Sequence, residues 1–444
     1  MKLPRHLLPS AWLVAALAGG AYATNPLIMD QFTADPSARV FGDRIYVYPS
    51  HDIPPVPGKS RPDWFCMEDY HVFSSANLTD WQDHGVILSQ TEVPWANPSA
   101  YALWAPDCVA KNGKYYFYFP AAVKPMGFRI GVAVADQPTG PFKPEATPIE
   151  GVQGIDPGVF IDDDGSAYLY YSRGKIMVAK LQDNMLQLDG PPKVIDNLPA
   201  KGLLEGPFLF KRKGVYYLTY PHVETKIERL EYATSNSPLG PFQPAGVILD
   251  EATSGCWTVH QSIVEFKGQW YLFYHDKDLS PAFDKNRSIR ADLLAFNDDG
   301  TIKKVVPTLR GVGLVAAQNK IELDRYSAIS DQGATVSFLD AANPRDGWQV
   351  TLAGTGAWVR FNGVDCGPGG QQALELRASA AAGGAVEIRL DRPDGPVVGR
   401  VAIAQGADWR IIPSAVKALP AGVHDLIVSS ADPNPVGLDW LRFH

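Results

Sequence analysis

The sequence has few cysteines for its length. Cys66, Cys108, Cys256 and Cys366 are the four cysteines among 444 residues. Their wide and irregular spacing excludes a dense disulfide framework and a zinc site built from paired cysteines. We expect four buried free thiols. A Cys66–Cys108 disulfide is the alternative, and the spacing is compatible with both.

The sequence also lacks an excess of positive charge and any long helical pattern. The formal net charge is −8, and lysine and arginine form no stripe or cluster. This balance excludes nucleic acid as a partner. Apolar residues do not recur at a 3.6-residue period over any long segment, whereas short runs alternate with a period of two between Gly, Pro and Asn. The pattern predicts an all-β protein.

Long apolar runs are absent after the first residues of the chain. Residues 1–23 have the form of a signal peptide: Lys2 and Arg5 precede an apolar run over 7–17, and Ala21-Tyr22-Ala23 offers a small-x-small cleavage site. The apolar run is too short to span a bilayer. We therefore expect an exported protein, periplasmic or secreted, that begins near Thr24 and has no membrane partner after cleavage.

One pattern recurs five times between residues 33 and 276. A polar or ionisable residue precedes a strand, a glycine turn and a second strand rich in tyrosine or phenylalanine. The five polar positions are Asp35, Asp107 within Trp104-Ala-Pro-Asp, Asp156, Glu205 and His260, and the turn glycines are Gly42, Gly113, Gly165, Gly214 and Gly268. Repeats of roughly 50 residues made of short strands are typical of propeller blades. The sequence thus predicts a five-bladed β-propeller over residues 24–318.

The repeat register predicts where the ionisable residues meet. In a propeller the first strand of each blade lines the central channel, so equivalent positions converge at one end of the axis. Asp35, Asp156, Glu205 and His260 would then share one site. Taken singly, each is equally a turn or capping residue, because Asp-Pro and Glu-Gly-Pro are common turn sequences. The proline-rich insertion 51–68 is expected to lie on the rim, as functional loops do.

Two carboxyl groups across a pocket are what cleavage of a glycosidic bond requires. Glu205 follows two leucines and precedes Pro-Phe, an apolar setting that raises a carboxyl pKa, so we expect it to be the general acid. Asp35 fits the ionised base. Asp156 is a third acid that could orient and tune the protonated one.

Four further residues are candidates for the same site, and Asp107 is expected to be structural. Trp104 and Trp257 could stack on the apolar faces of a sugar, with packing inside a blade as the alternative. Arg287 could reach substrate hydroxyls, or form a surface salt bridge. His260 could bind water or a metal in the channel, or serve as a structural histidine.

The composition changes near residue 318. From there to the end, aromatic-rich turns disappear and Gly, Ala, Val and Asp dominate. Short alternating strands, among them Ala385–Leu390 and Val423–Val428, predict a β-sandwich of jelly-roll type over residues 319–444.

These motifs together resemble glycoside hydrolase family 43. The resemblance rests on five segments spread over residues 25–315: Thr33-Ala-Asp35-Pro, Trp104-Ala-Pro-Asp, Gly154-Ile-Asp156-Pro, Glu205-Gly-Pro and Asn286-Arg-Ser followed by Asp299-Gly-Thr-Ile. It implies a five-bladed propeller and inversion at the anomeric carbon. It also implies Asp35 as general base, Asp156 as the pKa-modulating acid, Glu205 as general acid and Arg287 as a substrate contact.

The resemblance further implies a cofactor and a substrate class. His260 matches a histidine that helps to hold a structural calcium ion in the channel through water, and we expect no organic cofactor. Members act mostly on arabinose- and xylose-containing plant cell-wall polysaccharides and oligosaccharides.

The C-terminal region is similar to carbohydrate-binding modules of family 6. The similar segments are Ala357-Trp358-Val-Arg-Phe, Leu419-Pro-Ala-Gly422-Val-His and Leu438-Asp439-Trp440-Leu-Arg-Phe. Modules of this type often bind sugar through loop aromatics and an asparagine before the Leu-Asp-Trp segment. Here Gly437 occupies that position, and Trp409 is the candidate stacking residue.

We therefore expect an inverting, exo-acting hydrolase that releases α-L-arabinofuranosyl or β-D-xylosyl units from hemicellulose fragments. Two alternatives remain open from the sequence: a non-catalytic glycan-binding propeller, and a retaining propeller enzyme that acts on fructans.

Overall fold

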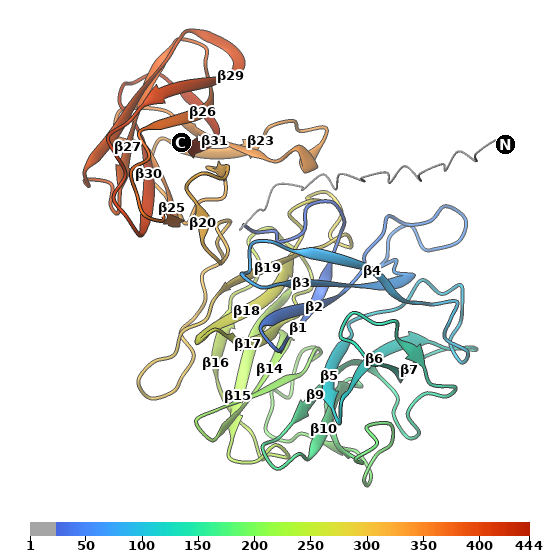
Figure 1. Ribbon diagram of the computed structural model, residues 1–444. Helices are drawn as coiled ribbons and strands as arrows, with labels where there is room; N and C mark the ends of the chain where they lie inside the picture. The colour runs from blue at the N-terminus through green and yellow to red at the C-terminus, as the bar shows by residue number, and fades with distance from the viewer. Residues whose placement is uncertain (1–23) are drawn as a thin grey trace, which may run out of the picture.

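The computed structural model describes residues 24–444, and the signal peptide expected over residues 1–23 lies outside the described residues. The described chain is all-β and falls into two parts (Figure 1). It contains no α-helix, and its one helical element is a single 3-10 turn, η1 (Pro344–Asp346). Within residues 24–444 we find no helix with the length and apolar character needed to cross a membrane. All four cysteines are buried free thiols, as expected, and no Cys66–Cys108 bridge is present.

Five antiparallel sheets of consecutive strands make up the first part. The first sheet holds β1 (Ala34–Phe41), β2 (Arg44–Ser50), β3 (Asp69–Ser75) and β4 (Gln82–Ser89); the second holds β5 (Asp107–Lys111), β6 (Lys114–Ala122), β7 (Phe128–Ala135) and β8 (Lys143–Pro144). The third holds β9 (Ile155–Ile161), β10 (Ala167–Ser172), β11 (Ile176–Leu181) and β12 (Lys193–Val194). The fourth holds β13 (Phe208–Arg212), β14 (Val215–Val223), β15 (Glu228–Ser235) and β16 (Gln243–Leu249), and the fifth holds β17 (Ser262–Phe266), β18 (Gln269–Asp276) and β19 (Ser288–Leu293).

The turn glycines of the repeats connect the first two strands of the sheets. At Asn112–Gly113, Lys213–Gly214 and Lys267–Gly268 both turn residues have positive φ. Two-residue hairpins of this kind match the twist of the flanking strands and favour glycine at the second position. The sequence pattern of strand, glycine turn and strand is therefore a set of tight hairpins.

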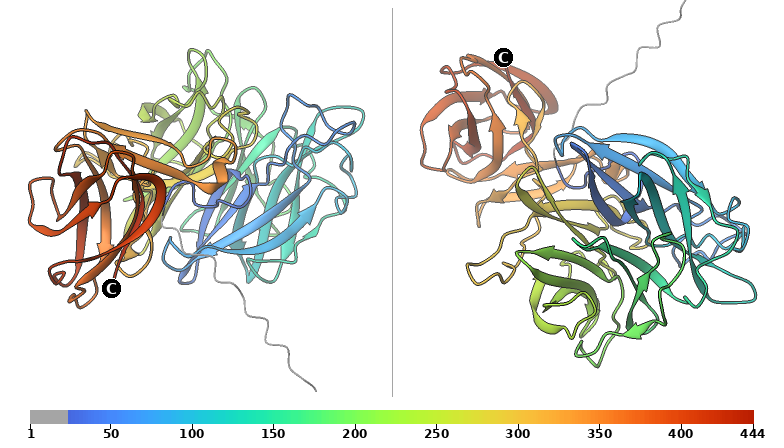
Figure 2. Two further views of the ribbon diagram at one scale, coloured as in Figure 1. Left: turned by 90° about the horizontal axis from the view of Figure 1, so that it is seen from above. Right: turned by 60° about the horizontal axis from the view of Figure 1, so that its bottom comes forward.

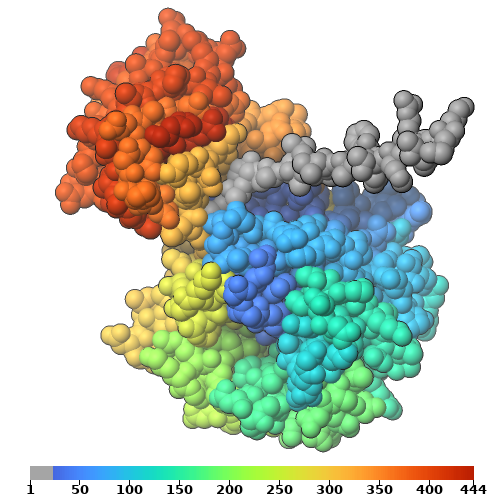
Figure 3. Space-filling view, in the orientation of Figure 1, coloured from blue at the N-terminus to red at the C-terminus, as the bar shows by residue number. Residues whose placement is uncertain are grey.

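The first strands of the five sheets pack against one another in chain order. β1 contacts β5, β5 contacts β9, β9 contacts β13, β13 contacts β17, and β17 returns to β1. Figure 3 shows the fifth sheet, coloured yellow, beside the dark-blue first sheet. The polar residues at the starts of these strands are therefore brought together at one end of the axis around which the five first strands are arranged.

Asp107 has the structural role expected for it. It is 2% exposed and accepts hydrogen bonds from Arg39 of β1, at 2.9 and 2.5 Å, and from the backbone N–H of Val159 in β9, at 2.6 Å. A carboxylate with this many donors is satisfied without water. It ties the first three sheets together at their inner strands.

Aromatic side chains fill the spaces between neighbouring sheets. The Tyr48 hydroxyl donates to the Pro138 carbonyl oxygen at 2.6 Å, and the Tyr170 hydroxyl donates to the Pro238 carbonyl oxygen at 2.5 Å. Each tyrosine lies on the second strand of its sheet and reaches the loop of the next sheet. Burial of these rings, with their hydroxyls satisfied, stabilises the contact between sheets.

The second part of the chain is a β-sandwich of two six-stranded sheets with an apolar core between them. One sheet contains β20 (Val315–Ala316), β22 (Ala328–Ile329), β25 (Trp358–Asp365), β27 (Gly384–Leu390), β28 (Val397–Ile403) and β30 (Val423–Ser430). The other contains β21 (Ile321–Glu322), β23 (Ala334–Phe338), β24 (Trp348–Leu352), β26 (Ala373–Ala380), β29 (Gly406–Ala415) and β31 (Val436–Phe443). The strand β20 pairs with β25, so the chain enters the sandwich at residue 315.

The sandwich stands to one side of the five sheets (Figure 2). Contacts at the junction come from the segment that links the two parts. The Arg325 guanidinium donates to the Asn25 carbonyl oxygen at 2.6 Å, and Arg310 Nε donates to the Asn362 carbonyl oxygen at 2.8 Å. The pocket described next is formed entirely within the first part.

Candidate active site

A pocket of about 210 Å³ lies at the end of the axis where the strand starts meet. It is lined by all seven site residues predicted from the sequence: Asp35, Trp104, Asp156, Glu205, Trp257, His260 and Arg287. These residues come from all five repeats and span more than 250 positions of the chain. The predicted convergence of Asp35, Asp156, Glu205 and His260 is thus observed.

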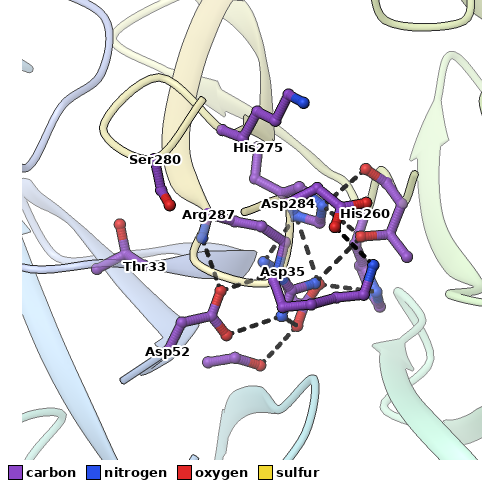
Figure 4. A network of polar contacts seen from close by, with 12 residues as sticks. Thr33, Asp35, Asp52, His260, His275, Ser280, Asp284 and Arg287 are labelled. Atoms are coloured by element: carbon purple, nitrogen blue, oxygen red, sulfur yellow. Dashed lines mark hydrogen bonds and ion pairs between the residues drawn. The ribbon is translucent and has the colours of Figure 1, made fainter. Parts of the chain in front are cut away.

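Asp35 lines the pocket and has a strained backbone conformation. Its φ is 46°, an uncommon left-handed value for a residue with a side chain, at a bulge in β1. Its carboxylate accepts hydrogen bonds from Arg287 Nη1 at 2.8 Å, Arg287 Nη2 at 3.2 Å and Ser50 Oγ at 2.6 Å (Figure 4). Strain at a functional position persists where surrounding contacts enforce it.

Arg287 lies between two aspartates, Asp35 and Asp52, and its guanidinium is a clamp that binds both. Its Nε and Nη2 donate to Asp52 at 2.9 Å each, opposite the two bonds to Asp35, and Nη1 also lies 3.4 Å from Thr258 Oγ1. All five guanidinium N–H groups therefore have protein acceptors. The alternative of a surface salt bridge is wrong, because Arg287 is only 3% exposed, whereas the substrate contact stays a prediction, since Arg287 lines the pocket.

The clamp decides the charge of Asp35. Burial raises the pKa of the Asp35 carboxyl, but the charge of Arg287 and the Ser50 hydrogen bond lower it to about 2. His275 Nδ1 accepts the backbone N–H of Asp35 at 3.0 Å, and its Nε2 donates to the Thr258 carbonyl oxygen at 3.0 Å. Burial lowers the pKa of His275 to about 3, so it is a neutral acceptor here.

Asp156 repeats the backbone geometry of Asp35 in the third sheet. Its φ is 56°, and its carboxylate accepts the backbone N–H of Gly206 at 3.0 Å. Burial and the neighbouring charge of Glu205 raise the pKa of the Asp156 carboxyl well above its usual value. Since Gly206 directly follows Glu205, this hydrogen bond fixes the corner that carries Glu205.

Glu205 lies just before β13, on a corner whose geometry favours glycine at the next position. Gly206 has φ 49°, and a Cβ there would lie 3.0 Å from the His260 ring. Burial raises the pKa of the Glu205 carboxyl, as does the charge of Asp35, while a hydrogen bond with Glu228 opposes the rise. The pocket therefore holds one carboxyl of lowered pKa, that of Asp35, beside carboxyls of raised pKa that include Glu205 and Asp156.

Aromatic rings form the pocket wall, and the insertion supplies part of it. Trp64 and Phe65 of residues 51–68 line the pocket with Trp104 and Trp257. The Phe65 ring centroid lies 6.2 Å from that of Trp104 and 6.5 Å from that of Trp257, and the Arg287 guanidinium lies 4.7 Å from the Phe65 centroid. Apolar walls with a few polar groups are typical of sugar and small-molecule pockets.

His260 has a place in the pocket but no set of direct metal ligands around it. Its Nδ1 lies 4.0 Å from Asp35 Oδ1, whose carboxylate is already held by Arg287. Among residues 24–444, groups of three ligating side chains occur at His51, Asp69 and His71 and at Glu322, Asp324 and Asp439, neither of which includes His260. Calcium takes six to eight oxygen ligands. The side chains around His260 do not fit direct coordination of calcium, and no step below involves a metal.

Four residues of the site were missed by sequence reasoning. Asp52 and Phe65 belong to the insertion, whose path over the pocket has no periodic signal. His275 and Glu228 lie at the end of β18 and the start of β15. The repeat pattern identifies only residues at the start of the first strand of each sheet, so it gives no information on residues at either terminus of the other strands. The one indication in the sequence was a polar residue directly after the last tyrosine of the second strand, as in Tyr274-His275.

This geometry suits displacement at a sugar carbon. An ionised carboxylate can activate water, and a protonated carboxyl across the pocket can donate its proton to a leaving oxygen. The aromatic wall can cover the apolar face of a sugar.

Comparison with known proteins agrees with this chemistry. The family model for glycosyl hydrolases family 43 matches residues 23–302, and that for carbohydrate binding module family 6 matches residues 328–444. A xylosidase/arabinosidase 43A of Humicola insolens is 39% identical over 327 residues, which cover 62% of this chain and 98% of the relative. An arabinoxylan arabinofuranohydrolase of Bacillus subtilis (strain 168) is 31% identical and covers 90% of this chain and 88% of its own length.

A solved structure is similar over the same region. It is a family 43 beta-xylosidase/alpha-arabinofuranosidase from a compost microbial metagenome, in complex with xylotriose and in a calcium-free form. It has 38% sequence identity and a TM-score of 0.58, and the match covers 64% of this chain and 98% of the other. The present chain is a glycosidase, and it belongs to glycosyl hydrolases family 43 with a C-terminal family 6 carbohydrate-binding module.

Proposed function

We propose that this protein is an inverting, exo-acting glycosidase that releases β-D-xylosyl or α-L-arabinofuranosyl units from hemicellulose fragments. The observation that carries the proposal is the contrast between two pocket carboxyls: Arg287 binds Asp35 and lowers its pKa, while burial and the charge of Asp35 raise the pKa of Glu205. The names of the relatives support xylose and arabinose as the sugars.

In the proposed mechanism Asp35 is the general base and Glu205 the general acid. Asp35 removes a proton from a water molecule as the water oxygen bonds to the anomeric carbon. The bond to the leaving oxygen breaks at the same time, and that oxygen takes the Glu205 proton. Asp156 orients the acid through the Gly206 N–H. A pair of this kind lies roughly 6.5–9.5 Å apart, which leaves room for water.

The five sheets are proposed to be the blades of a closed propeller. Support comes from the sequence of contacts between first strands, which runs from β1 through β5, β9 and β13 to β17 and back to β1. The domain division at residue 318 is likewise proposed, with 24–318 catalytic and 319–444 carbohydrate-binding.

Exo action is favoured by the insertion 51–68. Trp64, Phe65 and Met67 close one side of the pocket, where an endo-acting enzyme needs an open cleft. The signal-peptide pattern of residues 1–23 supports export to the periplasm or medium, where plant cell-wall oligosaccharides would be the substrates.

Hydrolysis of aryl β-D-xylopyranosides and aryl α-L-arabinofuranosides by the purified protein tests the proposal, with Asp35→Asn as the matched control. We expect the wild type to release the aryl alcohol from at least one substrate and the variant to release none. Turnover of neither substrate by the wild type, or equal turnover by both proteins, would overturn it.

A further inference from the structure

A second group of ionisable side chains, His51, Asp69 and His71, lies on the first sheet, outside the pocket. Asp69 and His71 are two positions apart on β3, so their side chains project from the same face of the sheet. His51 directly follows β2, the strand that pairs with β3 (Figure 1). None of the three lines the pocket, and the proposed mechanism uses none of them.

The three side chains are close enough to bind one ion. One potential ligand atom from each, a ring nitrogen or a carboxylate oxygen, lies within 4.8 Å of the other two. The His51 and His71 ring centroids are 4.6 Å apart, and His51 Nδ1 lies 2.6 Å from Asp69 Oδ1. The ligand atoms of a tetrahedral zinc ion lie roughly 3.3 Å apart, since its bonds are about 2.0–2.2 Å long. Small rotations of the side chains therefore suffice to bring all three ligand atoms onto one ion.

A fourth residue, Asp83 of β4, orients one of the two imidazoles. Its Oδ1 and Oδ2 lie 3.0 and 3.1 Å from His71 Nδ1, and Oδ2 also accepts a hydrogen bond from Gln31 Nε2 at 3.0 Å. A carboxylate that binds one ring nitrogen of a histidine fixes the tautomer and leaves the lone pair on the other nitrogen, here Nε2. Metal-binding histidines are commonly held by a carboxylate in this way.

The donor set selects the kind of ion. Two imidazoles and one carboxylate suit a divalent cation of borderline softness such as Zn²⁺, whereas Ca²⁺ takes six to eight oxygen ligands. The side chains of His51 and Asp69 are each 17% exposed and that of His71 is 14% exposed. An ion can therefore reach the three ligands from solvent, and a water molecule can complete its coordination.

We propose that His51, Asp69 and His71 form a binding site for a divalent cation of the Zn²⁺ class, and that the ion fixes the end of β2. The ion is structural and takes no part in the reaction at the pocket. The site stands whether or not the proposed hydrolytic function is correct, because none of its ligands belongs to the catalytic machinery.

The place of His51 in the chain connects this site to the pocket. The residue before it, Ser50, donates a hydrogen bond from Oγ to Asp35 at 2.6 Å, and the residue after it, Asp52, accepts one from Arg287 Nε at 2.9 Å. An ion bound at His51 therefore holds the backbone between the two residues that position the Asp35–Arg287 pair.

The test is Co²⁺ binding to the untagged full chain at slightly alkaline pH, where histidine is neutral, after a chelator has removed bound metals. Co²⁺ occupies the same nitrogen and oxygen sites as Zn²⁺ and absorbs visible light. We expect one equivalent of Co²⁺ to produce a saturable visible band, one equivalent of Zn²⁺ to abolish it, and Zn²⁺ to raise Tm by several degrees. Absence of a saturable band in the wild type would overturn the proposal, however the variants fold.

Variants locate the bound ion. His51→Ala and His71→Ala should weaken Co²⁺ binding roughly 100-fold or more, and Asp83→Asn roughly 10- to 100-fold, the usual effect of losing a carboxylate that orients a ligand. The matched control is His424→Ala. His424 Nδ1 also lies near a carboxylate, 3.1 Å from Asp391 Oδ1, but within residues 24–444 it belongs to no group of three ligating side chains.

Glu322→Gln separates this site from the other group of potential ligands, Glu322, Asp324 and Asp439, which offers only carboxylates. This variant and His424→Ala should both keep the Co²⁺ band of the wild type. A band that survives unchanged in His71→Ala, or that disappears in either control, would place the ion elsewhere and overturn the proposal.

Discussion

Arg287 holds Asp35 through two hydrogen bonds, of 2.8 and 3.2 Å, in a pocket where both side chains are nearly excluded from solvent. The same guanidinium binds Asp52 on its other side. An arginine between two carboxylates keeps at least one of them ionised at every pH at which an enzyme works. The charge of the proposed base therefore depends on the Arg287 side chain.

Replacing Arg287 should move the acidic limb of the pH–rate profile upward. Without the guanidinium, burial is no longer offset, so the Asp35 pKa rises from about 2 and protonation inactivates the base at higher pH. We expect Arg287→Gln to shift the acidic limb of kcat/KM up by roughly 1–3 pH units, the usual effect of an adjacent arginine on an aspartate. The measurement is the pH dependence of aryl glycoside hydrolysis.

Arg39→Gln is the control for this change. It removes another arginine from a buried aspartate, Asp107, that lies outside the pocket. Both variants should lose stability, on the order of 3–5 kcal/mol for a broken buried pair. A shift of the acidic limb in Arg39→Gln, or its absence in Arg287→Gln, would contradict the assigned role of the clamp.

Glu205→Gln should lose activity in proportion to the basicity of the leaving group. A general acid contributes roughly 10²–10⁴-fold, but only where the leaving oxygen needs a proton. We expect losses of that size on xylo-oligosaccharides and much smaller losses on 2,4-dinitrophenyl glycosides. The measurement is kcat of the variant and the wild type on both substrates. Equal losses on both would show that Glu205 is not the general acid.

His275 should make the fold less stable as the pH falls. Its pKa is about 3 in the folded protein and near 6.5 when exposed. Between these pH values the unfolded state binds a proton at His275 and the native state does not. The stability that depends on neutral His275 is complete above pH 6.5 and is lost between pH 6.5 and 3, at up to roughly 1.4 kcal/mol per pH unit.

His275→Asn can preserve the acceptor for the Asp35 N–H without a titrating ring. Chemical denaturation at several pH values should therefore give a flatter stability curve for this variant than for the wild type between pH 6.5 and 3. Parallel curves would show that His275 is already protonated in the native state.

Phe65 should contribute to substrate binding through its place between Trp104 and Trp257. Truncation to alanine opens the wall and uncovers the Arg287 guanidinium. We expect Phe65→Ala to lower kcat/KM roughly 3- to 10-fold, as loss of an aromatic contact does, and Phe65→Tyr to retain most of it. Steady-state kinetics on an aryl xyloside checks this, and an unchanged kcat/KM in Phe65→Ala would place the sugar elsewhere.

The sequence predicted the parts of the site that the repeat controls. Asp35, Asp156 and Glu205 stand at the start of first strands, and strand period and hairpin turns fix such positions locally. For the same reason the all-β class and the C-terminal sandwich could be read from strand alternation and turn residues.

The contacts that set the chemistry could not be predicted in this way. Through the fold of the insertion Asp52 reaches Arg287 and Phe65 reaches the pocket, and Glu228 lines the pocket from the start of β15. The sequence indicated that Arg287 was near the site but not that its guanidinium donates hydrogen bonds to both Asp35 and Asp52. These features depend on long-range packing, which leaves no periodic trace in a single sequence.

The stereochemistry of the first product tests the central claim most directly. ¹H NMR of the hydrolysis of an aryl β-D-xylopyranoside, recorded before mutarotation, identifies the anomer released. If Asp35 activates water opposite Glu205, α-xylose appears first and β-xylose follows by mutarotation. If β-xylose appears first, a carboxylate attacks the sugar directly, and the assignment of Asp35 as a general base is contradicted.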